Sequence, residues 1–399
     1  YVGGPTSIIE ILGPFGSGGS ASFPGHSFFM APEHDVQRVL IRFTVEGPPK
    51  NVYVYDPYHV EGDEARTRSN LAGLTKSEYD QYMILRRTYL FSQHYVQKTG
   101  RAYLVNYPRP RPAHFMWRAD YFDQVHWVTT RETQFVHLPP KDLLQEITHH
   151  GVSRRLKDSD PRLLAEYRES TPIRNMTLRV LSCAPRVFEV PNFLSQIEVD
   201  HILELAAKED LALSSTGFGA DAKEEEEDIR RTRTSYNSWL PREKSPILDA
   251  VYRRASDLMR IDEALLRFRT DGERPDVASK KPISESLQLV HYGVGQEYTA
   301  HHDFGFSDAG NSWQAQRFAT LLLYLNEGMK GGATTFPRWA NAETFEELRI
   351  EPQVGKAALF YSQLPDGNMD DLSHHQANKI REGEKWLINL WVWSPVYEH

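Results

Sequence analysis

Lys385-Trp386-Leu387-Ile388-Asn389-Leu390-Trp391-Val392-Trp393 is the stretch of sequence that decides the fold. It is a largely apolar run of strand length, which predicts a buried β-strand. A lysine at the start of such a strand needs an anionic partner, because an unpaired buried charge is costly. A solvated surface position, the usual fate of a lysine, is the alternative. Lys385 is therefore the first candidate functional residue.

Two histidine motifs precede this strand. His301-His302-Asp303 comes first, and Ser373-His374-His375 follows about seventy residues later, ten residues before Lys385. Two imidazoles and a carboxylate on one face of a metal leave the opposite positions open, as in non-haem Fe(II) oxygenases. At about 3.3 Å per strand residue, the step from His375 to Lys385 is long enough for a turn and a return to the same cavity. The lysine could then bind the far carboxylate of a dicarboxylic acid.

The histidine motifs would be weak signals alone, since a chain with 16 histidines and 54 acidic residues produces His-x-Asp triplets by chance. Other stretches add to them: Ala184 to Phe188, Asn192 to Ser195, Arg233 to Ser235, Gln288 to Tyr292, Tyr298, Gln316 to Thr320, Gly331 to Thr334, Leu364 to Gly367 and Glu382 to Trp386. In letters and spacing, the region from about Leu181 to Trp393 resembles the prolyl 4-hydroxylase branch of the Fe(II)/2-oxoglutarate dioxygenases.

The resemblance implies a role for individual side chains. The implied iron ligands are His301, Asp303 and His375. The implied partners of the 2-oxoglutarate carboxylate are Lys385, Tyr292 and Thr334. The implied peptide contacts are Arg233, Ser235, Glu285, Tyr298, Arg317 and Trp391.

Several of these assignments have alternatives. Adjacent strand residues point to opposite faces, so His302 and His374 are expected to be bystanders, with an exchange within the second pair as the main alternative. Arg233 could be an ordinary member of the basic cluster Arg230-Arg231-Thr232-Arg233, and Trp391 and Trp393 could be core residues. Where the resembling enzymes often carry a histidine, this chain has Trp393, and Ala333 replaces a common acidic residue. Neither difference affects the metal ligands.

The activity implied by the resemblance is that of a procollagen-proline 4-dioxygenase-like enzyme. It would hydroxylate prolyl residues in peptides or proteins to 4-hydroxyproline with Fe(II), O2 and 2-oxoglutarate, releasing succinate and CO2, with ascorbate as a further cofactor. The alternatives are a 2-oxoglutarate oxygenase acting on another residue or a free amino acid, and a catalytically silent module that binds proline-rich peptides. The intact ligand set and Lys385 argue against the silent module.

The composition limits the other possibilities. A net charge of −8 and a pI near 6.1 argue against nucleic acid as the main partner, and no apolar run is long enough to span a membrane. The single Cys183 excludes an internal disulfide. Tyr1 in place of Met suggests a processed start, with which any signal peptide or anchor would have been lost. The sequon Asn175-Met176-Thr177, and chiefly the resemblance, indicate the endoplasmic reticulum or Golgi lumen; a cytosolic location is the alternative.

The expected architecture is an all-β core with flanking helices, a double-stranded β-helix (jelly roll) over residues 175–399. Strands are expected over 287–292, 318–326, 356–362 and 385–393, and helices over 196–208 and 244–259. The Gly/Ser-rich stretch from Ser214 and the acidic run Glu224 to Asp228 are expected to form a substrate-gating loop, or a surface insertion without a role.

The N-terminal part is expected to be a β-rich accessory domain over residues 1–150, joined by a linker over 151–174. Its sequence around Phe23 to Phe29 faintly resembles the β-sandwich of von Hippel-Lindau-type domains. Strands are expected over 36–45 and 51–56, a helix from the capping box Thr75-Lys76-Ser77-Glu78 to about Arg87, and a polyproline II segment over 107–112. The domain would dock substrate or simply pack as a structural appendage.

Overall fold

The computed structural model describes residues 10–16, 18, 22–104, 111–131, 173–214, 232–305, 315–340 and 346–395. The chain divides into two compact units. The first comprises Tyr1–Arg111, Phe306–Gln314 and Asp366–Met369, and the second comprises Pro112–Gly305, Ala315–Pro365 and Asp370–His399. Most of the expected linker over 151–174, gating stretch over 214–228 and polyproline segment over 107–112 lies outside the described residues, namely residues 151–172, 215–228 and 107–110. The last two linker residues, 173 and 174, belong to a strand.

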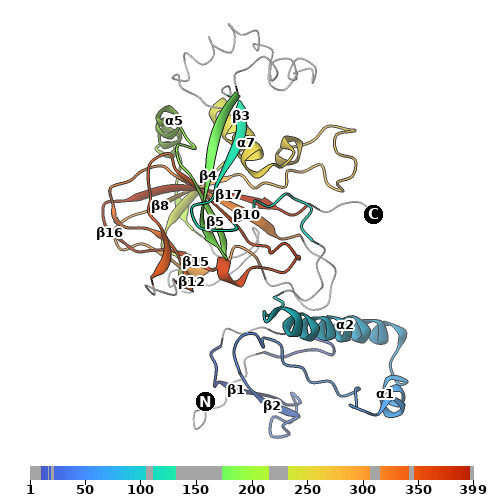
Figure 1. The fold of residues 1–399 in the computed structure, drawn as a ribbon. Coiled ribbons are helices and arrows are strands. Elements are labelled where there is room, and N and C mark those ends of the chain that lie inside the picture. The colour runs from blue at the N-terminus through green and yellow to red at the C-terminus, as the bar shows by residue number, and fades with distance from the viewer. Residues whose placement is uncertain are drawn as a thin grey trace. The chain divides into compact units, whose positions relative to one another are not determined.

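A nine-stranded antiparallel sheet forms the centre of the second unit (Figure 1). In spatial order its strands are β3 (Val125–Arg131), β4 (Ile173–Cys183), β5 (Arg186–Val190), β14 (Ala357–Tyr361), β10 (Arg317–Tyr324), β17 (Lys385–Trp393), β8 (Leu287–Tyr292), β7 (Tyr236–Leu240) and β6 (Ala212–Leu213). The apolar run Lys385–Trp393, β17, lies between β10 and β8 and pairs with both.

Alternate residues of β17 enter two different cores, as the period of a strand requires. Ile388, Leu390 and Val392 face the helices α5 (Gln196–Ala206) and α7 (Pro246–Met259), and they pack in one core with residues of both helices. On the opposite face, Leu387 packs with Tyr324 in the second core. Lys385 shares that second face, so the strand itself directs the lysine away from the helices.

A smaller four-stranded sheet covers the second face. Its order is β13 (Glu347–Ile350), β12 (Thr334–Ala340), β15 (His375–Ala377) and β9 (Tyr298–His301), and a short pair, β11 (Lys330–Gly331) and β16 (Ile380–Glu382), lies apart from it. Phe336 and Ile350 of the small sheet share the second core with Tyr324 and Leu387. Antiparallel sheets with few helices confirm the β-rich class and are consistent with the expected double-stranded β-helix.

The predicted elements of the second unit are close to the observed ones. β8 and β17 have the predicted bounds, β10 and β14 differ from theirs by one or two residues, and both helices are two residues shorter than predicted. Each helix begins where a serine side chain accepts a backbone hydrogen bond: Ser195 caps α5 and Ser245 caps α7, whose first residue is Pro246. The caps explain why the starts are well defined.

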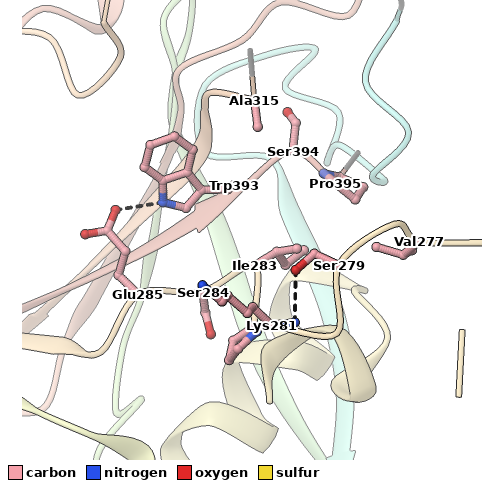
Figure 2. Close-up of a pocket in the computed structure, with 11 residues that line it drawn as sticks. Val277, Ser279, Lys281, Ile283, Ser284, Glu285, Ala315, Trp393, Ser394 and Pro395 are labelled. Carbon is pink, nitrogen blue, oxygen red and sulfur yellow. Dashed lines mark hydrogen bonds between the residues drawn. The ribbon is translucent and has the colours of Figure 1, made fainter. Parts of the chain in front are cut away.

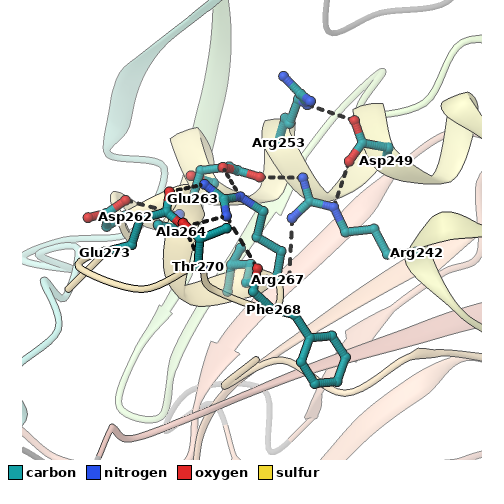
Figure 3. A network of polar contacts seen from close by, with 12 residues as sticks. Arg242, Asp249, Arg253, Asp262, Glu263, Ala264, Arg267, Phe268, Thr270 and Glu273 are labelled. Carbon is teal, nitrogen blue, oxygen red and sulfur yellow. Dashed lines mark hydrogen bonds and ion pairs between the residues drawn. The ribbon is translucent and has the colours of Figure 1, made fainter. Parts of the chain in front are cut away.

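Ion pairs fix the segment that follows α7 (Figure 3). Asp249 of α7 accepts bonds of 2.7 Å from both Arg242, in the 3₁₀ helix η2 (Arg242–Lys244), and Arg253. Arg242 also pairs with Glu263 in η3 (Glu263–Leu266). Arg267 joins Glu263 to Glu273, and its nearest distance to Glu273 is 2.8 Å. The network therefore ties η2, α7 and η3 to one another.

The first unit differs from its prediction. Its described elements are the strand pair β1 (Ser27–Met30) and β2 (Ile41–Thr44), with helices α1 (Glu64–Leu71) and α2 (Lys76–Thr99). The helices contain far more residues than the strands, so a β-rich domain of von Hippel-Lindau type is not confirmed, and no strand forms over 51–56. The capping box at Thr75 is present, but α2 continues to Thr99 and ends at Gly100, which has a left-handed φ of 68°.

The predicted boundary near residue 150 needs correction. β3 pairs with β4 along its whole length and so belongs to the large sheet, although its residues were assigned to the accessory domain. The division falls at Arg111 instead. In the described part of the chain, no helix is both long enough and apolar enough to cross a membrane.

Candidate active site

The small sheet brings the three predicted metal ligands together. His301 ends β9, His375 begins β15, and the two residues are direct partners across these antiparallel strands. Asp303 follows β9 by two residues. Its carboxylate oxygens lie 3.7 Å from Nε2 of His301 and 3.7 Å from Nε2 of His375. One ligand atom from each of the three residues lies within 4.8 Å of the others, so a single ion could bind all of them.

Hydrogen bonds orient each of these ligands. Nδ1 of His301 lies 2.8 Å from the carbonyl of Thr299, and Nδ1 of His375 lies 2.9 Å from the carbonyl of Ser373. A carbonyl only accepts, so Nδ1 carries the hydrogen in both rings and the lone pair of Nε2 is free for a metal. Thr320 of β10 donates a bond of 2.6 Å to Oδ2 of Asp303.

The electrostatics of the cluster suit a divalent metal. Burial lowers the pKa of both His301 and His375, which keeps their rings neutral. Burial by itself would raise the pKa of Asp303, but its electrostatic interactions with His375, His301 and Arg317 and its hydrogen bond from Thr320 outweigh burial and lower the pKa to about 2. One carboxylate and two neutral imidazoles are the protonation states that bind metal.

The neighbouring histidines take no part in this cluster. The rings of His302 and His374 pack on each other with centroids 4.7 Å apart. Nε2 of His302 also lies 3.2 Å from the carbonyl of Asp371, in the 3₁₀ helix η4 (Asp371–Ser373). The cluster therefore contains the predicted member of each pair, His301 and His375, and their role as metal ligands stays a prediction.

Lys385 is fully buried on the side of the large sheet that also faces the His301, Asp303 and His375 cluster. Its Nζ donates a bond of 2.6 Å to the carbonyl of Gly332 and lies 5.6 Å from the ring centroid of Tyr292. Burial lowers the pKa of Lys385 to about 7. Gly332 has a left-handed φ of 74°, and a Cβ there would lie only 2.5 Å from the Ile380 side chain, so another residue would strain the backbone and displace Ile380. The buried Lys385 ammonium has lost its contact with water, and a bound carboxylate could stabilise its charge instead.

The other two predicted carboxylate partners lie beside this lysine. Tyr292 of β8 is the direct strand partner of Lys385. Burial raises the pKa of Tyr292, so its hydroxyl stays protonated and can donate a hydrogen bond. Thr334 begins β12, next to the Gly332 turn, and its hydroxyl accepts a bond of 2.9 Å from Tyr324. Nζ of Lys385 lies 5.6 Å from the ring centroid of Tyr324, so Thr334 is linked to the lysine through this tyrosine.

The six predicted peptide contacts form two groups. In the first, Arg233 forms a β-bridge with Tyr298, and its guanidinium lies 4.5 Å from the Tyr298 ring centroid. Nε of Arg233 also donates a bond of 3.2 Å to Ser235. Since the Tyr298 ring stacks on His301 with centroids 3.6 Å apart, this group adjoins the metal ligands directly.

The second group lies at the other end of the site, where β10 and β17 pair. Arg317 and Glu285 form two bonds of 2.6 and 2.9 Å, and the Arg317 guanidinium stacks on Trp391 at 3.7 Å from the ring centroid. Trp393 also joins this group, because its Nε1 donates a bond of 2.7 Å to Glu285 (Figure 2). Its polar bond argues against a purely packing role for Trp393.

Sequence reasoning missed three residues that hydrogen-bond to the predicted site residues. Thr320 and Gln288 were parts of quoted stretches but had no assigned role, and Tyr324 was not singled out. Gln288 accepts a bond of 3.2 Å from Arg233. The available signal was the strand period: Thr320 and Tyr324 alternate with apolar residues on one face of β10.

Fold and site together fit an oxygenase that binds Fe(II) and 2-oxoglutarate, and the chain matches known proteins of that kind. A sequence model of the 2OG-Fe(II) oxygenase superfamily matches residues 287–393. Probable prolyl 4-hydroxylase 8 of Arabidopsis thaliana is 31% identical over 236 residues, 55% of this chain and 72% of the relative. Probable prolyl 4-hydroxylase 3 of the same plant is 29% identical over 235 residues, 55% of this chain and 73% of the relative.

The chain therefore belongs to the prolyl 4-hydroxylase family of 2OG-Fe(II) oxygenases. This family implies Fe(II) and 2-oxoglutarate, and the neutral imidazoles, ionised carboxylate and buried lysine described above fit both. Among solved structures, a viral collagen prolyl hydroxylase from Paramecium Bursaria Chlorella virus-1 in its 2OG complex is 22% identical, with a TM-score of 0.37 over 52% of this chain and 96% of that one.

Proposed function

We propose that this chain hydroxylates prolyl residues of peptides or proteins to 4-hydroxyproline. The observation that carries the proposal is the cluster of His301 with the buried Asp303 and His375, on the same side of the sheet as the buried Lys385. Bound Fe(II) and 2-oxoglutarate would supply the oxidising chemistry, in which O2 is consumed and succinate and CO2 are released. Ascorbate is proposed as an additional requirement, on the family resemblance alone.

The chain's own residues bind, orient and exclude water. His301, Asp303 and His375 would hold the metal through Nε2, a carboxylate oxygen and Nε2. Lys385, with Tyr292 and Thr334 beside it, would bind the far carboxylate of the co-substrate, and that anion would stabilise the charged form of the lysine. The apolar core around Tyr324 and Leu387 closes the inner end of the site to solvent.

The peptide would bind along the two groups of substrate residues. Arg233 and Tyr298 lie next to the metal ligands, and the Arg317, Glu285 and Trp391 group lies further along β10. Aromatic and arginine side chains of this kind offer flat surfaces to proline rings in an extended polyproline II segment. The relatives described above are named probable prolyl 4-hydroxylases, which supports proline as the target residue.

The decisive experiment combines product analysis with one variant. The purified chain is incubated with Fe(II), ascorbate, 2-oxoglutarate and proline-rich peptides, and mass spectrometry locates any single added oxygen. We expect 4-hydroxyproline that depends on Fe(II) and 2-oxoglutarate and is lost in Asp303→Ala. The exposed-site variant Asp271→Ala is the matched control and should retain activity. Hydroxylated free amino acids with untouched peptides would favour the first alternative, and peptide binding without succinate would favour the silent module.

The place of action is proposed to be the lumen of the endoplasmic reticulum or Golgi. The supporting observation is Asn175 of the sequon, which is exposed on β4 and therefore accessible to a glycosyl transferase. Expression in secretory eukaryotic cells should give a glycan at Asn175 that glycosidase removes. A cytosolic enzyme would remain unmodified. The first unit is proposed to dock substrate.

A further inference from the structure

We propose that a pocket beside Trp393 binds an apolar side chain of the peptide substrate about three residues from the target proline. This inference rests on the proposed function and adds a specificity site to it. The pocket has a volume of about 270 Å³ (Figure 2). Its lining residues are Val277, Ser279, Lys281, Pro282, Ile283, Ser284, Glu285, Ala315, Trp393, Ser394 and Pro395.

The pocket is continuous with the peptide site through Glu285. The Glu285 carboxylate accepts bonds from Arg317, a predicted peptide contact, and from Nε1 of Trp393, which is a wall of the pocket. A peptide that follows the Arg317 and Trp391 surface would therefore reach the pocket next. The bond to Glu285 also fixes the plane of the Trp393 indole, so this wall is formed before a ligand arrives.

The backbone around the pocket is held firmly. The amide of Ile283 donates a bond of 2.8 Å to the carbonyl of Leu265, and the amide of Trp393 donates one of 2.8 Å to the carbonyl of Ile283. Tyr252 donates a bond of 2.7 Å to the carbonyl of Glu285. Leu265 lies in η3, which the ion-pair network of Figure 3 ties to α7. The pocket wall is thus anchored to the helix layer.

The chemistry of the walls selects an apolar side chain. Val277, Pro282, Ile283, Ala315 and Pro395 are aliphatic, and Trp393 is aromatic. The hydroxyls of Ser284 and Ser394 are already engaged, with Leu266 and Gln363 respectively. Of the other polar lining residues, Ser279 already accepts a bond of 3.2 Å from the amide of Lys281, and Lys281 is exposed, so its ammonium can stay in water. A polar side chain would lose its own water in the pocket, whereas an apolar one gains from burial.

The position along the peptide follows from the strand geometry. Thr320 contacts the metal ligand Asp303, and Arg317, next to the pocket, lies three residues earlier on β10. Three strand residues span about 10 Å. A polyproline II peptide rises about 3.1 Å per residue, so about three residues separate the reacting proline from the pocket.

The test uses peptides that differ only at one position. Leucine, alanine or aspartate is placed two, three or four residues before or after one proline, and affinity is measured by fluorescence anisotropy without O2, with Fe(II) and 2-oxoglutarate present. At one position near the third, leucine should bind about ten-fold more tightly than alanine, and aspartate more weakly. Equal affinities at every position would overturn the inference.

Two variants then locate the preference. Ala315→Leu fills the pocket, and Trp393→His removes a wall by introducing the residue that resembling enzymes often carry. Each should reduce the preference for leucine to less than about two-fold, as expected when most of the buried area is lost. Ala207→Leu, the same change as the first at the exposed end of α5, should leave it intact. A preference that survives both pocket variants would place the apolar subsite elsewhere and overturn the inference.

Parallel hydroxylation assays separate this inference from the proposed function. Hydroxyproline formed without any dependence on the varied residue would refute the pocket and leave the function standing. Binding that depends on leucine, with no hydroxyproline formed, would refute the function and leave the pocket standing. Peptides that neither bind nor react would refute both.

Discussion

Thr320 is a single residue whose hydroxyl links the sheet to the metal site. Thr320 is completely buried on β10, and its bond of 2.6 Å to Asp303 orients the carboxylate. Groups that orient metal ligands typically contribute about 10- to 100-fold to metal affinity or activity. We predict that Thr320→Val, which keeps the shape but removes the donor, weakens Co(II) binding by about that factor in a spectroscopic titration.

The control for this change is Thr129→Val, because Thr129 is an exposed threonine on the edge strand β3. It should bind Co(II) like the unaltered protein. Thermal unfolding of both variants without metal shows whether the fold is kept. If Thr320→Val bound Co(II) normally, the hydrogen bond would have no part in arranging the ligands.

Lys385 predicts a dependence of 2-oxoglutarate binding on pH. The pKa of Lys385 is about 7 without a ligand, because the lysine is buried. Below pH 7 the lysine is already charged and can bind the carboxylate directly. Above pH 7 it is mostly neutral, so binding must bring a proton with it, and affinity falls by up to about ten-fold for each further pH unit.

Calorimetry in buffers of different ionisation enthalpy measures this proton directly. At pH 8 we expect uptake approaching one proton for each 2-oxoglutarate bound, and at pH 6 almost none. Lys385→Met should bind far more weakly, whereas Lys330→Met, at an exposed lysine paired with Glu382, should behave normally. Uptake that is the same at both pH values would assign the titrating group to another residue.

For single residues, the sequence predicted the candidate ligands but not the residues that orient them. His301, Asp303, His375 and Lys385 are unusual residue types in a fixed order, and such an order can be recognised. Thr320 and Gln288 are ordinary polar residues whose importance depends on which strand lies next to theirs. Trp393 is intermediate: its difference from the resembling enzymes was visible, but its bond to Glu285 depends on the approach of distant segments.

Among the secondary-structure elements, α5 and α7 are joined by a fully buried ion pair. Arg254 of α7 bonds both carboxylate oxygens of Glu198, and one of these distances is 2.9 Å. Glu198 is also the third residue of the capping box that starts α5 at Ser195. Removing one partner from a buried pair leaves an uncompensated charge, which typically costs about 3–5 kcal/mol.

We predict that Glu198→Gln lowers the free energy of unfolding by about that amount in urea titrations. Glu204→Gln, at an exposed glutamate on the same helix, should change it by less than about 0.5 kcal/mol. An equally small effect at Glu198 would mean that Arg254 finds another acceptor, such as the carbonyl of Phe193, to which it already donates.

The elements were predictable where local and long-range signals agree. β8 and β17 are continuous apolar runs that can only be buried, so both bounds were right. α2 continued past Arg87 because no breaker occurs before Gly100, while its weakly apolar pattern gave no reason to extend it. β3 was misassigned to the accessory domain, because its partner β4 begins more than forty residues later and pairing over such a separation leaves no local mark.

On the scale of the whole molecule, the first unit is assembled from distant parts of the sequence. Asp366–Met369 comes between β14 and β15 in the sequence but belongs to the unit that contains α2. Tyr95 of α2 donates a bond of 2.8 Å to Asp366, and burial raises the pKa of Tyr95 to about 12. Sequence reasoning treated the N-terminal domain as one continuous segment. A single boundary in the sequence cannot describe a unit that is built from separate segments.

Asn368 is the residue on which this assembly depends most. It is almost completely buried, its amide donates to the carbonyl of Ala102 at 2.9 Å, and its carbonyl accepts from the amide of Leu104 at 2.9 Å. Because Asn368→Ala leaves both backbone groups unpaired, we predict a loss of about 1–3 kcal/mol in the stability of the first unit. In hydrogen-exchange mass spectrometry, the amide of Leu104 and the last turn of α2 should exchange faster, while β10 and β17 keep their protection. Asn70→Ala removes a single bond to Tyr58 in the same unit and should have a smaller, local effect. Unchanged exchange at Leu104 in Asn368→Ala would show that the 366–369 segment is not needed to hold the first unit together.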